Sequence, residues 1–146
     1  MQSLSLDQYE RLRRLAATWE QDRQEELATA AHANPRLSVD TLCFQAFAPW
    51  PEQGPEEAYL AGALITPLSL SLVLVAAESA TAAPQPGQRQ AFRFPSGRYP
   101  FTAECLSDGT WLWRCELLDD LSDLDAAEEA SRLAQRLMER VMTPEA

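Results

Sequence analysis

Residues 64–75, LITPLSLSLVLV, form the interrupted apolar stretch that organises this chain. Pro67 has no amide donor and its ring forces Thr66 into an extended conformation, so the Thr-Pro pair predicts a bulge, a bend or a sheet edge. From Leu68 onward, leucines alternate first with serine and then with valine, which is the two-residue period of a strand. We therefore expect a β-strand that is half-buried at its start and buried on both faces at its end.

Two further strands are predicted before this stretch. Residues 42–47 alternate in hydropathy up to Pro49-Trp50-Pro51, and residues 59–65 form a second apolar run beyond a segment rich in turn residues. These two strands are expected to pair as a hairpin. Gly62 lies inside the second run and predicts the close approach of another backbone or side chain.

Strands rich in aromatic residues are predicted after residues 64–75. Residues 76–90 are rich in Ala, Ser, Pro and Gln and are expected to form a long surface loop. The sequence FRFPSGRYPF, residues 92–101, then predicts two strand segments joined by a Pro-Ser-Gly turn whose glycine supplies a positive φ. Residues 106–109 predict a further turn, and residues 110–118 a last strand. Its apolar face is expected to comprise Trp111, Trp113, Cys115 and Leu117.

Amphipathic helices are predicted at both ends of the chain. Apolar residues spaced three and four apart predict the first helix, which begins at a capping box of Ser5 and Gln8 and ends before Asn34-Pro35. The second helix has acidic residues at its start and arginines further along, which matches the helix dipole.

Together these elements predict one α+β domain spanning residues 1–146. The N-terminal helix is expected over about residues 6–33, the sheet over about 40–118 and the C-terminal helix over about 123–142. We expect an antiparallel sheet of about five strands with both terminal helices packed on one of its faces. The other face would then be covered, paired or used, and function is expected there.

Composition excludes several functions. The 22 acidic and 12 basic residues give a net charge of −10, which disfavours nucleic acid and anionic membranes as partners. Every basic residue is arginine, so the chain has no lysine for a Schiff base or a P-loop. The single histidine, His32, has no nucleophile and base arrangement near it. No apolar run is long enough for a membrane span and no export leader is evident, so a cytoplasmic protein is predicted.

Three cysteines, Cys43, Cys105 and Cys115, are spaced too widely for a zinc motif. We expect reduced thiols that serve as small core residues on strands, and no metal or cofactor site. Direct metal delivery through these three cysteines is the alternative interpretation.

The strand motifs, in content and order, resemble the HybE-type assembly chaperones of [NiFe]-hydrogenases over about residues 42–142. In that family a Gly-containing strand reaches a Thr-Pro pair and continues as an aliphatic strand, as Gly62, Thr66-Pro67 and residues 68–75 do here. An aromatic-Pro-Ser-Gly segment then leads to an aromatic strand, which residues 94–101 match.

The resemblance has departures as well. Cys115 stands where the family has a cysteine before small, hydroxyl and proline residues, but residues 116–120 here are ELLDD. Leu68 stands where an aromatic residue often follows Thr-Pro. If these positions contact a client, the choice of client is expected to differ.

The resemblance implies a non-catalytic chaperone that binds immature hydrogenase subunits in the cytoplasm during maturation, before export. The implied partners are the small-subunit precursor with its twin-arginine leader and, in some members, the large subunit. Seven residues are placed at strand interruptions, and we expect them to border the client surface; the alternative is that they only shape the sheet. They are Thr66, Pro67, Leu68, Pro95, Ser96, Gly97 and Tyr99.

Two other function classes are compatible with parts of the sequence. A secretion-type chaperone is also a small, acidic protein of mixed α/β structure, but it would lack the Thr-Pro and Pro-Ser-Gly motifs in this order. An enzyme with Asp119 and Asp120 as a carboxylate pair is disfavoured, because adjacent residues on a strand point to opposite faces.

Overall fold

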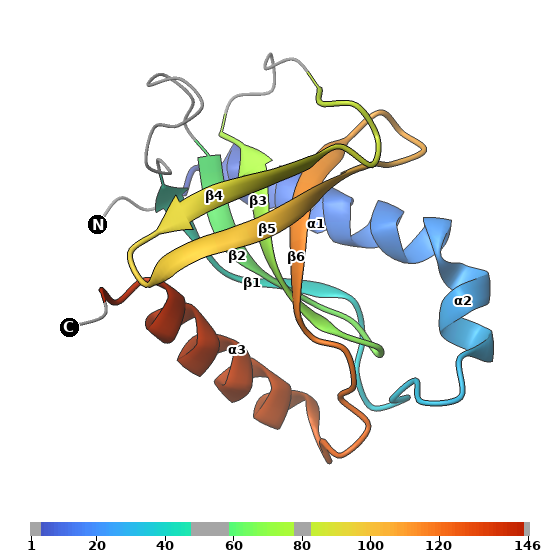
Figure 1. Ribbon diagram of the computed structural model, residues 1–146. Coiled ribbons are helices and arrows are strands. Elements are labelled where there is room, and N and C mark those ends of the chain that lie inside the picture. Colours follow the sequence, from blue (N-terminus) through green and yellow to red (C-terminus); the bar gives the residue numbers. More distant parts are fainter. Residues whose placement is uncertain (1–3, 48–58, 78–82, 145–146) are drawn as a thin grey trace.

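The computed structural model of the protein describes residues 4–47, 59–77 and 83–144 (Figure 1). In this part of the chain, six strands form one antiparallel sheet in the order β1-β2-β3-β6-β5-β4. The strands are β1 (Asp40–Phe47), β2 (Tyr59–Ile65), β3 (Leu70–Ala76), β4 (Arg89–Phe94), β5 (Gly97–Cys105) and β6 (Trp111–Leu118). The helices are α1 (Leu6–Asp22), α2 (Gln24–Thr29) and α3 (Ala127–Val141). The predicted α+β class is confirmed, with one strand more than the expected number.

The two long helices lie on opposite faces of the sheet, so the prediction that both cover one face is wrong (Figure 1). On β3, Leu72 and Leu74 join the core beneath α3, whereas Val73 and Val75 join the core beneath α1. A strand that is apolar on both sides has to be covered on both sides, because exposed apolar surface is unfavourable in water. One helix on each face meets this requirement.

The sheet is curled, so that the ends of its two edge strands come into side-chain contact. Phe47 of β1 stacks on Phe94 of β4 with ring centroids 4.6 Å apart, although four strands separate them in the sheet. Tyr59 of β2 likewise packs edge-on against Phe92 of β4 at 5.7 Å. The β4–β5 hairpin thus folds across the sheet (Figure 1), and the concave side that results is filled by aromatic rings and by α3.

The first helix is not continuous, contrary to the prediction of one helix to residue 33. It begins at the expected capping box, but α1 ends at Asp22 and the short α2 begins after Arg23. Tertiary contacts explain the break: the Asp22 carboxylate accepts hydrogen bonds from Ser107, and the Arg23 guanidinium donates to Glu104. These contacts bind the chain to β5 and to the β5–β6 turn at the point where α1 ends, and the periodic pattern contains no signal for them.

β1 contains a bulge that the alternating pattern did not predict. The pairing with β2 shifts between Leu42 and Gln45, and Cys43 has a φ of 61°. The bulge places the ring of Phe44 over Gly62, where a Cβ atom would overlap the ring. The prediction that Gly62 accepts a close neighbour is therefore confirmed.

Two other boundaries differ from the predictions. β4 begins at Arg89, so the last two residues of the expected loop 76–90 belong to a strand, and residues 78–82 of this loop lie outside the described residues. α3 begins at residue 127 rather than 123. The acidic residues before it form turns instead, in which the Asp120 carboxylate accepts a hydrogen bond from the Ser122 N–H at 2.9 Å. Residues 49–57 also lie outside the described residues.

Candidate functional site

The seven residues expected to border a client surface fall into two separate groups. Thr66, Pro67 and Leu68 form the turn between β2 and β3, and the other four lie at the β4–β5 turn. The first turn adjoins the segment before α3, whereas the second contacts the C-terminal end of α3. A helix of 15 residues is about 22 Å long, so the two groups lie at opposite ends of α3 and do not form one patch.

Thr66 holds the first turn from within. Its side chain is fully buried, and its hydroxyl accepts hydrogen bonds from the N–H groups of Leu68 at 2.9 Å and Ser69 at 3.0 Å. The Thr66 N–H donates to the Ser69 carbonyl at 2.9 Å. Pro67 and Leu68 are half-buried. The Thr-Pro pair thus forms a bend, one of the three possibilities that the sequence left open.

Asn34, a buried residue that the sequence patterns did not single out, ties this turn to the rest of the fold. Its N–H donates to the Pro67 carbonyl at 2.9 Å, and its side-chain amide donates to the carbonyls of Leu121 and Leu124, each at 2.9 Å. Its side-chain oxygen accepts from the Arg36 N–H at 3.0 Å. The only sequence signal for this role was Asn34-Pro35, which was interpreted as a helix stop.

Replacing Thr66 with valine is expected to lower the free energy of unfolding by about 1–3 kcal/mol, because valine keeps the shape but leaves two N–H groups without their acceptor. Thr102→Val on β5 is the matched control, since Thr102 is a half-buried strand residue; it should change stability by less than about 0.5 kcal/mol. Urea unfolding of both variants measures the difference. Equal losses would contradict a structural role for the Thr66 hydroxyl.

The second turn is more exposed. Pro95 and Gly97 are exposed, and Gly97 adopts the expected positive φ, 148°. The hydroxyl groups of Ser96 and Tyr99 lie 2.6 Å apart, and the Ser96 N–H donates to the Val141 carbonyl at 3.1 Å. This turn is therefore a defined, partly accessible surface beside the end of α3.

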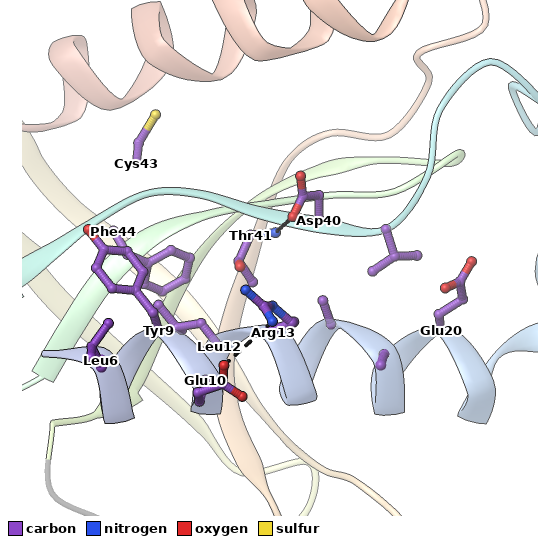
Figure 2. A pocket seen from close by; sticks show the side chains of 13 residues that line it. Leu6, Tyr9, Glu10, Leu12, Arg13, Glu20, Asp40, Thr41, Cys43 and Phe44 are labelled. Atoms are coloured by element: carbon purple, nitrogen blue, oxygen red, sulfur yellow. Dashed lines mark hydrogen bonds and ion pairs between the residues drawn. The ribbon is translucent and has the colours of Figure 1, made fainter. Parts of the chain in front are cut away.

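A groove that sequence reasoning missed runs between α1 and the edge strand β1 (Figure 2). Its volume is about 730 Å³. Leu6 and Tyr9 of α1 line it and are 85% and 53% exposed, the large hydrophobic residues most open to solvent in the described part of the chain. The opposite wall includes the ring of Phe44. Val39 also lines the groove. Tyr9 is spaced three residues before the buried Leu12 but does not share its burial.

The groove is acidic as well as apolar. Glu10, Glu20 and Asp40 line it together with one cation, Arg13, which pairs with Glu10 at 3.5 Å. Among the described residues no cation pairs with Glu20 or Asp40. The helix spacing of Leu6, Tyr9, Arg13 and Glu20 was the sequence signal that could have marked this second face of α1.

A second groove of about 740 Å³ lies on the other side of β1, against α3. Met138, Glu139 and Met142 line it, and Cys43 lines both grooves. In Figure 2 the Cys43 side chain points away from α1 toward α3, whereas Phe44 faces the α1 groove. Partial desolvation of the thiol, reinforced by the negative charge of Glu139, raises the pKa of Cys43.

The three cysteines differ in burial. All three are free, but only Cys115 is buried, so the prediction of core positions is wrong for Cys43 and Cys105, which the bulge and the end of β5 leave exposed. Burial raises the pKa of the Cys115 thiol. Within the described ranges, no group of three or more Cys, His, Asp or Glu side chains is placed to hold a metal ion. Among the helices of those ranges, none is both long and apolar enough to cross a membrane.

The fold and its surfaces thus define an α+β protein with accessible, acidic and apolar grooves beside a sheet edge. The family model described as "[NiFe]-hydrogenase assembly, chaperone, HybE" matches residues 10–146. The chain therefore belongs to the HybE family of [NiFe]-hydrogenase assembly chaperones, as its motifs had suggested.

A solved structure supports the same architecture. The solution structure of HybE from Escherichia coli superposes with a TM-score of 0.61 at 19% sequence identity, covering 87% of this chain and 76% of that one. At this level of identity the likeness shows a shared fold. No curated protein matches the sequence.

Proposed function

We propose that this protein binds immature [NiFe]-hydrogenase subunits in the cytoplasm, with the small-subunit precursor and its twin-arginine leader as the main client and the large subunit as a further one. The observation that carries this proposal is the family match over residues 10–146. The secretion-type chaperone has no support in that match. Binding without catalysis is part of the proposal.

The surface chemistry supports this function in two ways. A chaperone that holds an incomplete subunit needs accessible apolar side chains, and Leu6 and Tyr9 supply them. A twin-arginine leader is cationic, and a net charge of −10 attracts a cation at long range and speeds encounter.

The turn residues remain part of the proposal in two roles. Pro95 and Gly97 are exposed, so they are suited to direct contact with a client; half-buried Ser96 and Tyr99 would hold that turn. Thr66 is buried and would act by shaping the turn that presents Pro67 and Leu68.

Binding of the purified protein to the purified small-subunit precursor, with and without its leader, tests the proposal. We expect the full precursor to bind and the leaderless form to bind more weakly, with an affinity that falls as salt concentration rises. The large subunit is tested in the same way as the second expected client, and an unrelated protein exported with a twin-arginine leader is the specificity control. Failure to bind either hydrogenase subunit would contradict the proposed function.

A further inference from the structure

The sheet has one edge that is flanked by two grooves. β1 is an edge strand, and no described strand pairs with its outer side. An edge strand directs part of its N–H and C=O groups outward, where another chain can pair with them. β1 has α1 beside one face and α3 beside the other, with an open groove on each side.

The two grooves are arranged as the side chains of an added strand would require. Successive side chains of a strand point to opposite faces. A strand placed along β1 would therefore send alternate side chains into the α1 groove and into the α3 groove. Cys43 lines both grooves, so they meet at the middle of β1.

The backbone at this meeting point is unusual. A positive φ is uncommon for a residue other than glycine, and such strain persists where the surrounding structure imposes it, frequently at ligand-binding positions. The φ of 61° at Cys43 turns its side chain toward α3 and lets Phe44 face the α1 groove. The bulge thereby opens both grooves at the same place.

The lining of the grooves indicates the chemistry of the occupant. The α1 groove exposes Leu6 and Tyr9, and the α3 groove is lined by Met138 and Met142, whose flexible side chains adapt to different apolar partners. The charged residues of the two grooves are four carboxylates and one guanidinium: Glu10, Glu20, Asp40, Glu139 and Arg13. An occupant with apolar and basic side chains complements this lining.

We propose that the outer edge of β1 takes up an extended segment of the client subunit as an added strand, with apolar side chains entering both grooves and basic side chains meeting Glu20 and Asp40. The inference rests on the proposed function, because the occupant is a segment of the client. Main-chain hydrogen bonds supply affinity in this mode, and the grooves select the side chains.

Paired substitutions test the location. Leu6→Gln with Tyr9→Gln should weaken binding of the small-subunit precursor by at least about tenfold, as truncation of central apolar contacts does. Glu20→Gln with Asp40→Asn should weaken it and reduce its dependence on salt. The matched control is Glu25→Gln with Asp123→Asn, two exposed acids away from both grooves, which should leave binding unchanged. All of these side chains are exposed, so circular dichroism and thermal melting should match those of the parent protein.

A backbone test addresses strand addition. Peptides tiled along the small-subunit precursor identify the bound segment, and single N-methylation of each amide of that peptide then probes its hydrogen bonds. Loss of binding at every second position is expected, because only alternate amides of an added strand face β1. Uniform tolerance of N-methylation would overturn strand addition.

The outcomes separate the two proposals. Unchanged precursor binding by both groove variants would overturn the location and leave the proposed function standing. Absence of binding by the parent protein to either hydrogenase subunit would overturn both.

Discussion

Replacing Phe92 with alanine is expected to lower the free energy of unfolding by about 3–5 kcal/mol, the usual cost of removing a buried phenylalanine. The Phe92 side chain is 1% exposed and packs edge-on against three rings at once. The ring centroids of Tyr59, Phe101 and Trp113 lie 5.7, 5.3 and 5.3 Å from its own. Because Tyr59 belongs to β2, which is not adjacent to β4 in the sheet, the substitution removes packing that keeps the sheet curled.

Phe47→Ala is the matched control for this prediction. Phe47 also joins the two edges of the curled sheet, stacking on Phe94, but it is only half-buried. Its replacement should cost about 1–2 kcal/mol, because less apolar area returns to water and a smaller cavity remains. Urea unfolding of both variants measures the difference. Equal losses of unfolding free energy in the two variants would show that packing around Phe92 is not what stabilises the core on the concave side.

Replacing Glu104 with alanine is expected to cost about 2–3 kcal/mol, because one carboxylate holds three donors. Its oxygens accept from the indole N–H of Trp19 at 3.1 Å, from Arg23 at 3.0 Å and from Arg114 at 2.7 Å. The Glu104 side chain is 16% exposed. Removal would leave two guanidinium groups close together and partly desolvated, which costs more than the loss of an exposed ion pair. It would also loosen α1 from β5 and β6.

Glu116 offers a control with the same side chain and the same partner. Its carboxylate lies 3.4 Å from Arg114 but is 45% exposed, so Glu116→Ala should cost less than about 1 kcal/mol. Thermal and urea unfolding of the two single variants measure the contrast. If both variants lose the same stability, the Glu104 network does not fasten α1 to the sheet.

Much of the fold followed from local patterns. The alternation in residues 64–75 predicted β3 and the burial of its end on both faces, but its start, which was expected to be half-buried, is buried as well. The capping box at Ser5 and Gln8 predicted where α1 begins. Gly62 predicted a close neighbour, which is Phe44. These predictions succeeded because turn residues, caps and strand periods act over a few residues of chain.

The errors share one physical cause, which is contact between distant segments. α1 ends at Asp22 because Asp22 binds Ser107 and the next residue, Arg23, binds Glu104. Cys43 is exposed because a bulge places Phe44 over Gly62. The helices lie on opposite faces because the central strand β3 packs into a separate core on each side. None of these contacts leaves a periodic signal in the sequence.

The candidate sites divide in the same way. The Pro-Ser-Gly turn was predictable from its residues, and it is where the sequence placed it. The grooves beside β1 were not, because the sequence does not show which strand lies at an edge or which helix borders it. Leu6 and Tyr9 are ordinary helix residues until α1 is placed beside that edge.

The sequence by itself determined the α+β class, the strands and their turns, and the family to which the chain belongs, since these depend on local periods and on ordered motifs. Only the tertiary structure decided which faces the helices cover, which side chains donate hydrogen bonds to the Glu104 carboxylate, and where an apolar and acidic groove opens. Those features arise from residues far apart in the chain, and their positions depend on how the sheet curls and which strands it leaves at its edges.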